Sequence, residues 1–142
     1  MPVQLASEDE APLPGTRMFE LTQEHTELVF GGLAVKPAVS LNRGFAAPVI
    51  LDQGLSDEEL AFLARHETDP FNRWDAMNRL LINAVHTQTR AKLLRTPEEV
   101  SPLVITAALE VLKNPDLSPA FKAAALSLPS EKLVAEEDPL ID

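Results

Sequence analysis

The hydrophobic pattern of this chain changes its period once, close to Ser56. Up to about residue 52, short apolar-rich runs alternate with turn residues, and beyond Ser56 apolar residues recur at helical spacing. Alternating runs bounded by turn residues predict strands, whereas a period near 3.6 predicts amphipathic helices. The 142 residues are therefore expected to fold as a β part followed by an α part, with domains at residues 1–52 and 53–142.

Capping signals mark where the helices of the second part begin. Ser56 with Glu59 three residues later forms a capping box and predicts a helix that ends near His66. Three further starts join a good N-cap residue to a proline at the first helical position: Asp69-Pro70, Ser101-Pro102 and Ser118-Pro119. They predict helices over 70–94, 101–113 and 118–126, and Ser130 is expected to cap a last short helix. Apolar helices in such a series are typical of stacked antiparallel helical hairpins.

The first part contains four short runs that predict strands: 17–21, 26–30, 36–42 and 47–52. Short strands with turn signals at close spacing indicate part of a β-sandwich, although four strands are few for a complete one. Arg43-Gly44-Phe45 separates the last two runs. Gly44 is expected to adopt a positive φ there, because glycine tolerates that conformation without steric cost.

An aromatic stripe runs along the expected helix 70–94. Phe71, Trp74, Leu81 and Val85 recur at near-helical spacing, which is more typical of a core face than of a ligand cage. Trp74 is therefore predicted to be buried, and its replacement by Ala is expected to cost about 3–5 kcal/mol.

The stretch "HETDP" (66–70) opens like the zinc-protease signature H-E-x-x-H. That signature needs a second histidine four residues on, and here the position holds Pro70, which cannot ligate zinc. No catalytic, cofactor-binding or metal residue is predicted in this chain. A cryptic metalloenzyme using His25, His66, Glu67 and His86 is an alternative that stoichiometric zinc after dialysis would support.

Composition excludes several other classes of function. The formal net charge is -10, which disfavours binding to nucleic acid. No apolar run approaches the roughly 20 residues of a membrane span, and the N-terminus lacks the pattern of a signal peptide, so no membrane partner is expected. The chain has no Cys, which fits a reducing compartment, and we expect a cytoplasmic location.

Two phrases carry a resemblance to a known family: "LNRGFAAPVIL" (41–51) and "DPFNRWDAMNRLL" (69–81). In this order and at this spacing they resemble the bacterial aminopeptidase N family of zinc metallopeptidases. The resemblance implies the end of a small immunoglobulin-like β domain, followed by the start of a C-terminal helical superhelix. The family's catalytic and zinc-binding residues have no matching positions here, and zinc is expected in the catalytic domain of the parent protein.

The resemblance implies a structural role in an enzyme that removes N-terminal amino acids from peptides. The chain would link the catalytic domain to the helical domain, help enclose the active-site cavity, and have the remaining domains of the parent as partners. Seven residues are expected to hold the β–α junction: Arg43, Gly44, Phe45, Phe71, Arg73, Trp74 and Asp75.

A free-standing protein-interaction module, built from a small β domain and helical hairpins, is the alternative. An open reading frame that continues upstream through H-E-x-x-H would exclude it. Strand edges and a helix face left uncovered by the β and α parts also make self-association of the chain an expectation.

Overall fold

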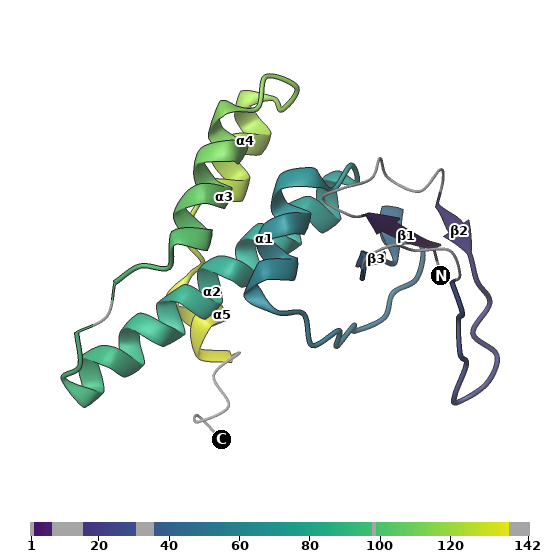
Figure 1. Ribbon diagram of the computed structural model, residues 1–142, viewed down its shortest axis with the longest axis horizontal. Helices are drawn as coiled ribbons and strands as arrows, with labels where there is room; N and C mark the ends of the chain where they lie inside the picture. The colour runs from purple at the N-terminus through teal and green to yellow at the C-terminus, as the bar shows by residue number, and fades with distance from the viewer. Residues whose placement is uncertain (1, 7–15, 31–35, 98, 137–142) are drawn as a thin grey trace.

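The structure is a computed structural model that describes residues 2–6, 16–30, 36–97 and 99–136. The strands are β1 (Pro2–Ala6), β2 (Arg17–Met18) and β3 (Ala38–Leu41), and a 3-10 turn η1 (Arg43–Phe45) follows β3. The helices are α1 (Asp57–His66), α2 (Pro70–Leu94), α3 (Pro102–Lys113), α4 (Pro119–Leu126) and α5 (Glu131–Glu136). The strands lie at one end of the molecule with α1 beside them, and α3, α4 and α5 lie farther from the sheet (Figure 1).

The strands form one small antiparallel sheet in the order β2-β1-β3. The run 36–42 is confirmed as a strand at Ala38–Leu41, but the run 17–21 forms only the two-residue strand Arg17–Met18. β1, which the sequence pattern did not predict, pairs with both and supplies the centre of the sheet.

The prediction of strands at 26–30 and 47–52 is wrong. Neither segment carries strand structure. The run 47–52 contains Pro48, which cannot donate to a ladder, and its Ile50 side chain is 101% exposed. In the run 26–30 Val29 is 82% exposed, while Phe30 packs edge-to-face on Phe19 with ring centroids 6.1 Å apart.

The helix starts follow the predicted caps. Ser56 accepts a hydrogen bond from the Glu59 amide, and the Glu59 carboxylate accepts one from the Ser56 amide at 3.0 Å, so the capping box is confirmed. Asp69, Ser101 and Ser118 each cap a helix whose first turn contains proline. The capping residues in the sequence therefore set where these helices begin.

The core forms where α1 packs on α2 and α3. Leu60 and Leu63 of α1 are buried, and Met77 and Leu80 of α2 are 0% exposed. The prediction that Trp74 belongs to this core is wrong, because Trp74 is half-buried and the neighbouring Phe71 is 46% exposed. The buried stripe of α2 follows Ala76, Met77, Leu80 and Leu81 instead, since this face meets α1.

Candidate functional site

The chain turns sharply between the sheet and the helices at residues 42–47, here called the β–α corner. Asn42, Gly44 and Phe45 all adopt positive φ values, of 51°, 68° and 51°. The positive φ expected for Gly44 is confirmed. The buried Asn42 side chain closes the corner, because its Oδ1 accepts from the Ala47 amide at 2.9 Å and its Nδ2 donates to the Ala47 carbonyl at 2.8 Å.

The β–α corner is bound to the turn between α1 and α2. The Arg43 guanidinium lies 3.1 Å from the Glu67 carboxylate and donates to Thr68 Oγ1 at 2.6 Å. The Gly44 amide donates to Asp69 Oδ2 at 2.9 Å. The Arg43 and Glu67 side chains are only 11% and 3% exposed, so this ion pair is withdrawn from water and depends on its geometry.

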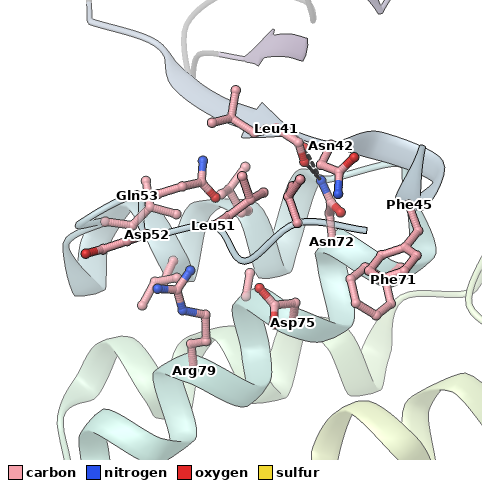
Figure 2. A pocket seen from close by; sticks show the side chains of 16 residues that line it. Leu41, Asn42, Phe45, Leu51, Asp52, Gln53, Phe71, Asn72, Asp75 and Arg79 are labelled. Atoms are coloured by element: carbon pink, nitrogen blue, oxygen red, sulfur yellow. Dashed lines mark hydrogen bonds between the residues drawn. The ribbon is translucent and has the colours of Figure 1, made fainter. Parts of the chain in front are cut away.

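Asp69 and Asn72 extend this contact into α2. Asp69 Oδ1 accepts from the Asn72 amide at 3.0 Å, which caps the helix, while Oδ2 holds Gly44. The Asn72 side-chain amide donates to Ser40 Oγ at 2.8 Å and to the Leu41 carbonyl at 2.7 Å (Figure 2). The first turn of α2 is therefore hydrogen-bonded directly to β3.

Arg73 ties α2 to the end of α1. Its Nε donates to the Ala64 carbonyl at 3.1 Å, and its guanidinium also donates to the carbonyl of Arg65. These carbonyls belong to the last turn of α1, where no intrahelical amide remains to satisfy them. Burial lowers the pKa of the Arg73 guanidinium from its ordinary value, and the negative charges of Glu67 and Asp116 oppose that shift.

Aromatic side chains cover one side of the β–α corner. Phe45 of η1 packs edge-to-face on Phe71 with ring centroids 5.3 Å apart, and Phe71 lies 5.8 Å from Trp74. Of the seven residues expected at the junction, these three share contacts, Arg43 and Gly44 bind the α1–α2 turn, and Arg73 binds the end of α1. Asp75 instead lines a cavity beside the corner.

The sequence assigns no junction role to Asn42, Glu67, Thr68, Asp69 or Asn72, although all five belong to this network. In the sequence, Glu67 stands out only as part of "HETDP" and as a candidate metal ligand, Thr68 only as part of "HETDP", and Asp69 only as a helix cap. Asn72 carries no sequence signal for its contact with β3, because the two segments are 31 residues apart. An Asp at a helix start needs only one carboxylate oxygen for the cap, so the second oxygen of Asp69 is a signal for a further contact.

A second ion pair links the sheet side to α1. Lys36 Nζ lies 2.7 Å from Glu59 Oε1, while the other Glu59 oxygen completes the capping box. The hydrogen bond from Lys36, followed by that from the Ser56 amide, lowers the pKa of Glu59 from its ordinary value.

A cavity of ≈ 380 Å³ lies between the β–α corner, the segment 51–53, α1 and α2 (Figure 2). Leu60 and Leu63 from α1 and Ala76 from α2 line it with apolar surface. Asp75 and Arg79, one helical turn apart on α2, add opposite charges.

The candidate metal ligands do not converge. Glu67 is engaged by Arg43, and His86 Nε2 lies 2.9 Å from the Val134 carbonyl. The His66 ring packs on Phe62 with centroids 4.7 Å apart. Across the described residues, no group of three or more His, Cys, Asp or Glu side chains could hold a metal ion. These donors therefore do not fit a zinc site.

No helix in the described part of the chain is long and apolar enough to cross a membrane.

Family models match both parts of the chain. Residues 1–54 match a domain described as "Domain of unknown function (DUF3458) Ig-like fold", and residues 57–142 match "Domain of unknown function (DUF3458_C) ARM repeats". The first match lies on the β part and the second on the helices. A partial Ig-like fold followed by an ARM-like helical domain is thus the architecture of the chain, as the sequence predicted.

Similar proteins carry the name aminopeptidase. The chain is 33% identical over 129 residues to aminopeptidase N of Escherichia coli strain K12 and 32% identical over 130 residues to that of Caulobacter vibrioides. Each match covers 91% of this chain and 15% of the relative. The solved structure of Legionella pneumophila aminopeptidase A shares the fold, with a TM-score of 0.79 at 23% identity over 97% of this chain and 16% of that one.

The chain thus spans about 15% of the length of the curated relatives it matches. Over that span the resemblance carried by "LNRGFAAPVIL" and "DPFNRWDAMNRLL" is confirmed, with both phrases meeting at the β–α corner. The chain belongs to the DUF3458 family and, through these paired Ig-like and ARM-repeat domains, to the bacterial aminopeptidase N family.

Proposed function

We propose that this chain is a non-catalytic structural part of a zinc aminopeptidase, an enzyme that removes N-terminal amino acids from peptides. In this role it links the catalytic domain to the helical domain and helps enclose the active-site cavity. The remaining domains of the parent are its partners, and the zinc belongs to the catalytic domain. The observation that carries the proposal is the interlocked β–α corner.

A domain that links two others has to hold a fixed orientation between them. The hydrogen bonds at the β–α corner can hold the sheet and the helices in one orientation. Arg43, Gly44 and Asn72 connect the sheet side to the α1–α2 turn and to the first turn of α2 through short hydrogen bonds. The buried pair of Arg43 and Glu67 adds a contact with little freedom to rearrange. A flexible tether needs none of these contacts, whereas a rigid link between two domains depends on contacts of this kind.

The helical half supports the enclosing role. Ile105, Leu109 and Leu112 recur on one face of α3 and are 50%, 44% and 53% exposed. In repeat proteins each repeat buries such a face against its neighbour. The ARM-repeat match of this segment supports further helices on α3, which would extend the wall of a cavity.

The exposed α3 face also favours the alternative of a free-standing interaction module, since a partner protein could cover the same side chains. The two functions differ in what binds the chain. The structural part binds the catalytic portion of its own parent, and the interaction module does not.

Two measurements test the proposal. The purified chain is assayed on an alanyl or leucyl amide with and without zinc, and no turnover is expected. The catalytic portion of the parent, expressed separately, is then titrated with the chain, and complex formation is expected. Zinc-dependent turnover by the chain that is lost in His66→Ala would contradict the structural role. If the catalytic portion does not bind the chain, the interaction module is favoured.

A further inference from the structure

We infer that the cavity beside the β–α corner binds a free α-amino acid with an apolar side chain. The inference goes beyond the structural role proposed above and does not depend on it. It rests on the size of the cavity, on its apolar walls and on two opposite charges that face it from α2.

The walls of the cavity suit an aliphatic side chain. Leu60 and Leu63, which are 2% and 6% exposed, come from α1, and Leu51 and Leu55 come from the segment before it. A volume of ≈ 380 Å³ is near the lower end of the range for small-molecule sites, roughly 300–1,000 Å³. It accommodates one amino acid better than a peptide.

Most polar groups that line the cavity are already used within the fold. Asn42 bonds the Ala47 backbone, Asn72 bonds β3, and the Gln53 amide donates to the Val39 carbonyl at 3.4 Å. These groups can shape the cavity but have little hydrogen-bonding capacity left for a ligand.

Arg79 differs from these groups. It is half-buried on α2, and within the described residues its guanidinium forms no hydrogen bond or ion pair. Figure 2 shows its side chain directed toward the segment 51–53 at one side of the cavity. A guanidinium presents a planar fork of donors that matches a carboxylate, so a ligand carboxylate is the group expected to occupy it.

Asp75 supplies the opposite charge. It lies one turn before Arg79 on α2, and its carboxylate points into the same space (Figure 2). Side chains four residues apart on a helix have Cβ atoms about 5–6 Å apart, which allows one small ligand to contact both. An ionised carboxylate accepts several hydrogen bonds, so Asp75 can receive an ammonium group beside its other contacts. Asp52 also lines the cavity, and its Oδ1 accepts from the Gly54 amide at 3.3 Å. The cation and the anion that α2 places beside apolar walls fit a zwitterion better than a simple acid or amine.

The ammonium group could also come from the N-terminus of a peptide, which lacks a neighbouring carboxylate. L-leucine, L-leucinamide and isocaproate separate these sources, because leucinamide lacks the carboxylate and isocaproate lacks the ammonium. Titration of the full chain is followed by calorimetry and by amide NMR shifts. We expect leucine to bind at least tenfold more tightly than either analogue, with shifts in the segment 51–53 and around Arg79.

Variants test the residues. Arg79→Gln is expected to weaken leucine binding at least tenfold while leaving leucinamide nearly unchanged, and Asp75→Asn is expected to weaken leucinamide binding. Arg90→Gln, the same change at an exposed position of α2, is the matched control, and thermal unfolding shows that each variant is folded. The inference is overturned if leucine does not bind, or if isocaproate binds as tightly as leucine. It is also overturned if leucinamide binds more tightly than leucine, or if folded Arg79→Gln binds leucine as tightly as the unchanged chain.

Discussion

At the scale of single residues, the junction depends on polar side chains that each serve two segments. Asp69 caps α2 with one carboxylate oxygen and holds the Gly44 amide with the other. Glu67 pairs with Arg43 and also accepts from the Asp69 amide at 2.7 Å. Asp69 uses its two carboxylate oxygens for the two contacts, whereas Glu67 uses Oε1 for both, since a carboxylate oxygen can accept more than one hydrogen bond. Replacing such a residue therefore removes more than one contact.

The Arg43–Glu67 pair gives the first prediction. Glu67→Ala is expected to lower the free energy of unfolding by about 3 kcal/mol, because it leaves a guanidinium that is 11% exposed without its partner. Chemical denaturation measures the change. Lys132→Ala is the control, since the Lys132–Glu136 pair is 83% and 61% exposed and is expected to contribute less than about 0.5 kcal/mol. Equal losses in both variants would contradict a buried, geometry-dependent pair.

The lowered pKa of Glu59 gives a prediction about pH. A carboxylate whose folded pKa is depressed stabilises the fold above its unfolded pKa, and this stability is lost as the pH falls through the folded pKa. Lys36→Met is expected to cost about 0.5–1 kcal/mol near neutral pH, since Lys36 is 83% exposed, and almost nothing at acid pH. Urea unfolding at about pH 7 and about pH 3 measures the difference. A cost that persists in acid would show that Lys36 acts through packing rather than charge.

At the scale of elements, α2 shows that helical spacing of apolar residues does not by itself identify the face that is buried in the core. The aromatic residues at its start face the β–α corner, and the buried stripe begins at Ala76. A side chain can therefore be apolar and helically spaced without belonging to the main core.

Met77→Ala and Trp74→Ala compare the two faces of α2. Met77 is 0% exposed, and its truncation is expected to cost about 2–5 kcal/mol through lost burial and a residual cavity. Trp74 is half-buried, so its truncation is expected to cost only about 1–2 kcal/mol despite the larger side chain. Melting temperatures of the two variants measure the order. A larger loss for Trp74 would place the core on the aromatic face.

The helices were predictable because their signals are local. The Ser56 box and the caps before Pro70, Pro102 and Pro119 fix the helix starts within a few residues of sequence. The sheet was not predictable in the same way, because β1 pairs with β3 across more than 30 residues. A strand depends on its pairing partner, and local sequence does not show which segment that partner is. The junction was foreseen in part: Arg43 and Gly44 lay within a recognisable phrase, whereas Asn72 acts on distant backbone.

At the scale of the whole molecule, the sheet is joined to the helices through polar contacts at the β–α corner, whereas α1 and α2 are joined to each other through an apolar core. Stability is therefore expected to differ along the chain, with the helical core as the more protected unit.

Asn72→Ala tests this coupling. It removes the side-chain amide that donates to Ser40 and Leu41, while the buried stripe of α2 is left intact. Amide hydrogen exchange in β3 is expected to accelerate at least tenfold, with little change in α3. Asn83→Ala, which removes a side-chain amide that donates to Asp57 at the start of α1 at 2.8 Å, is the matched control. Uniform acceleration in both helices and strands would mean that the chain opens as one unit.

The arrangement of the β–α corner also bears on what happens when the backbone is cut. Residues 46–55 form an irregular segment whose Ile50 is 101% exposed, so a protease can reach it. The contacts of Arg43, Gly44 and Asn72 bridge the two sides of that segment without using it. Cleavage there would leave two polypeptides that still recognise each other, so the same contacts make the chain a natural starting point for a split-protein reporter.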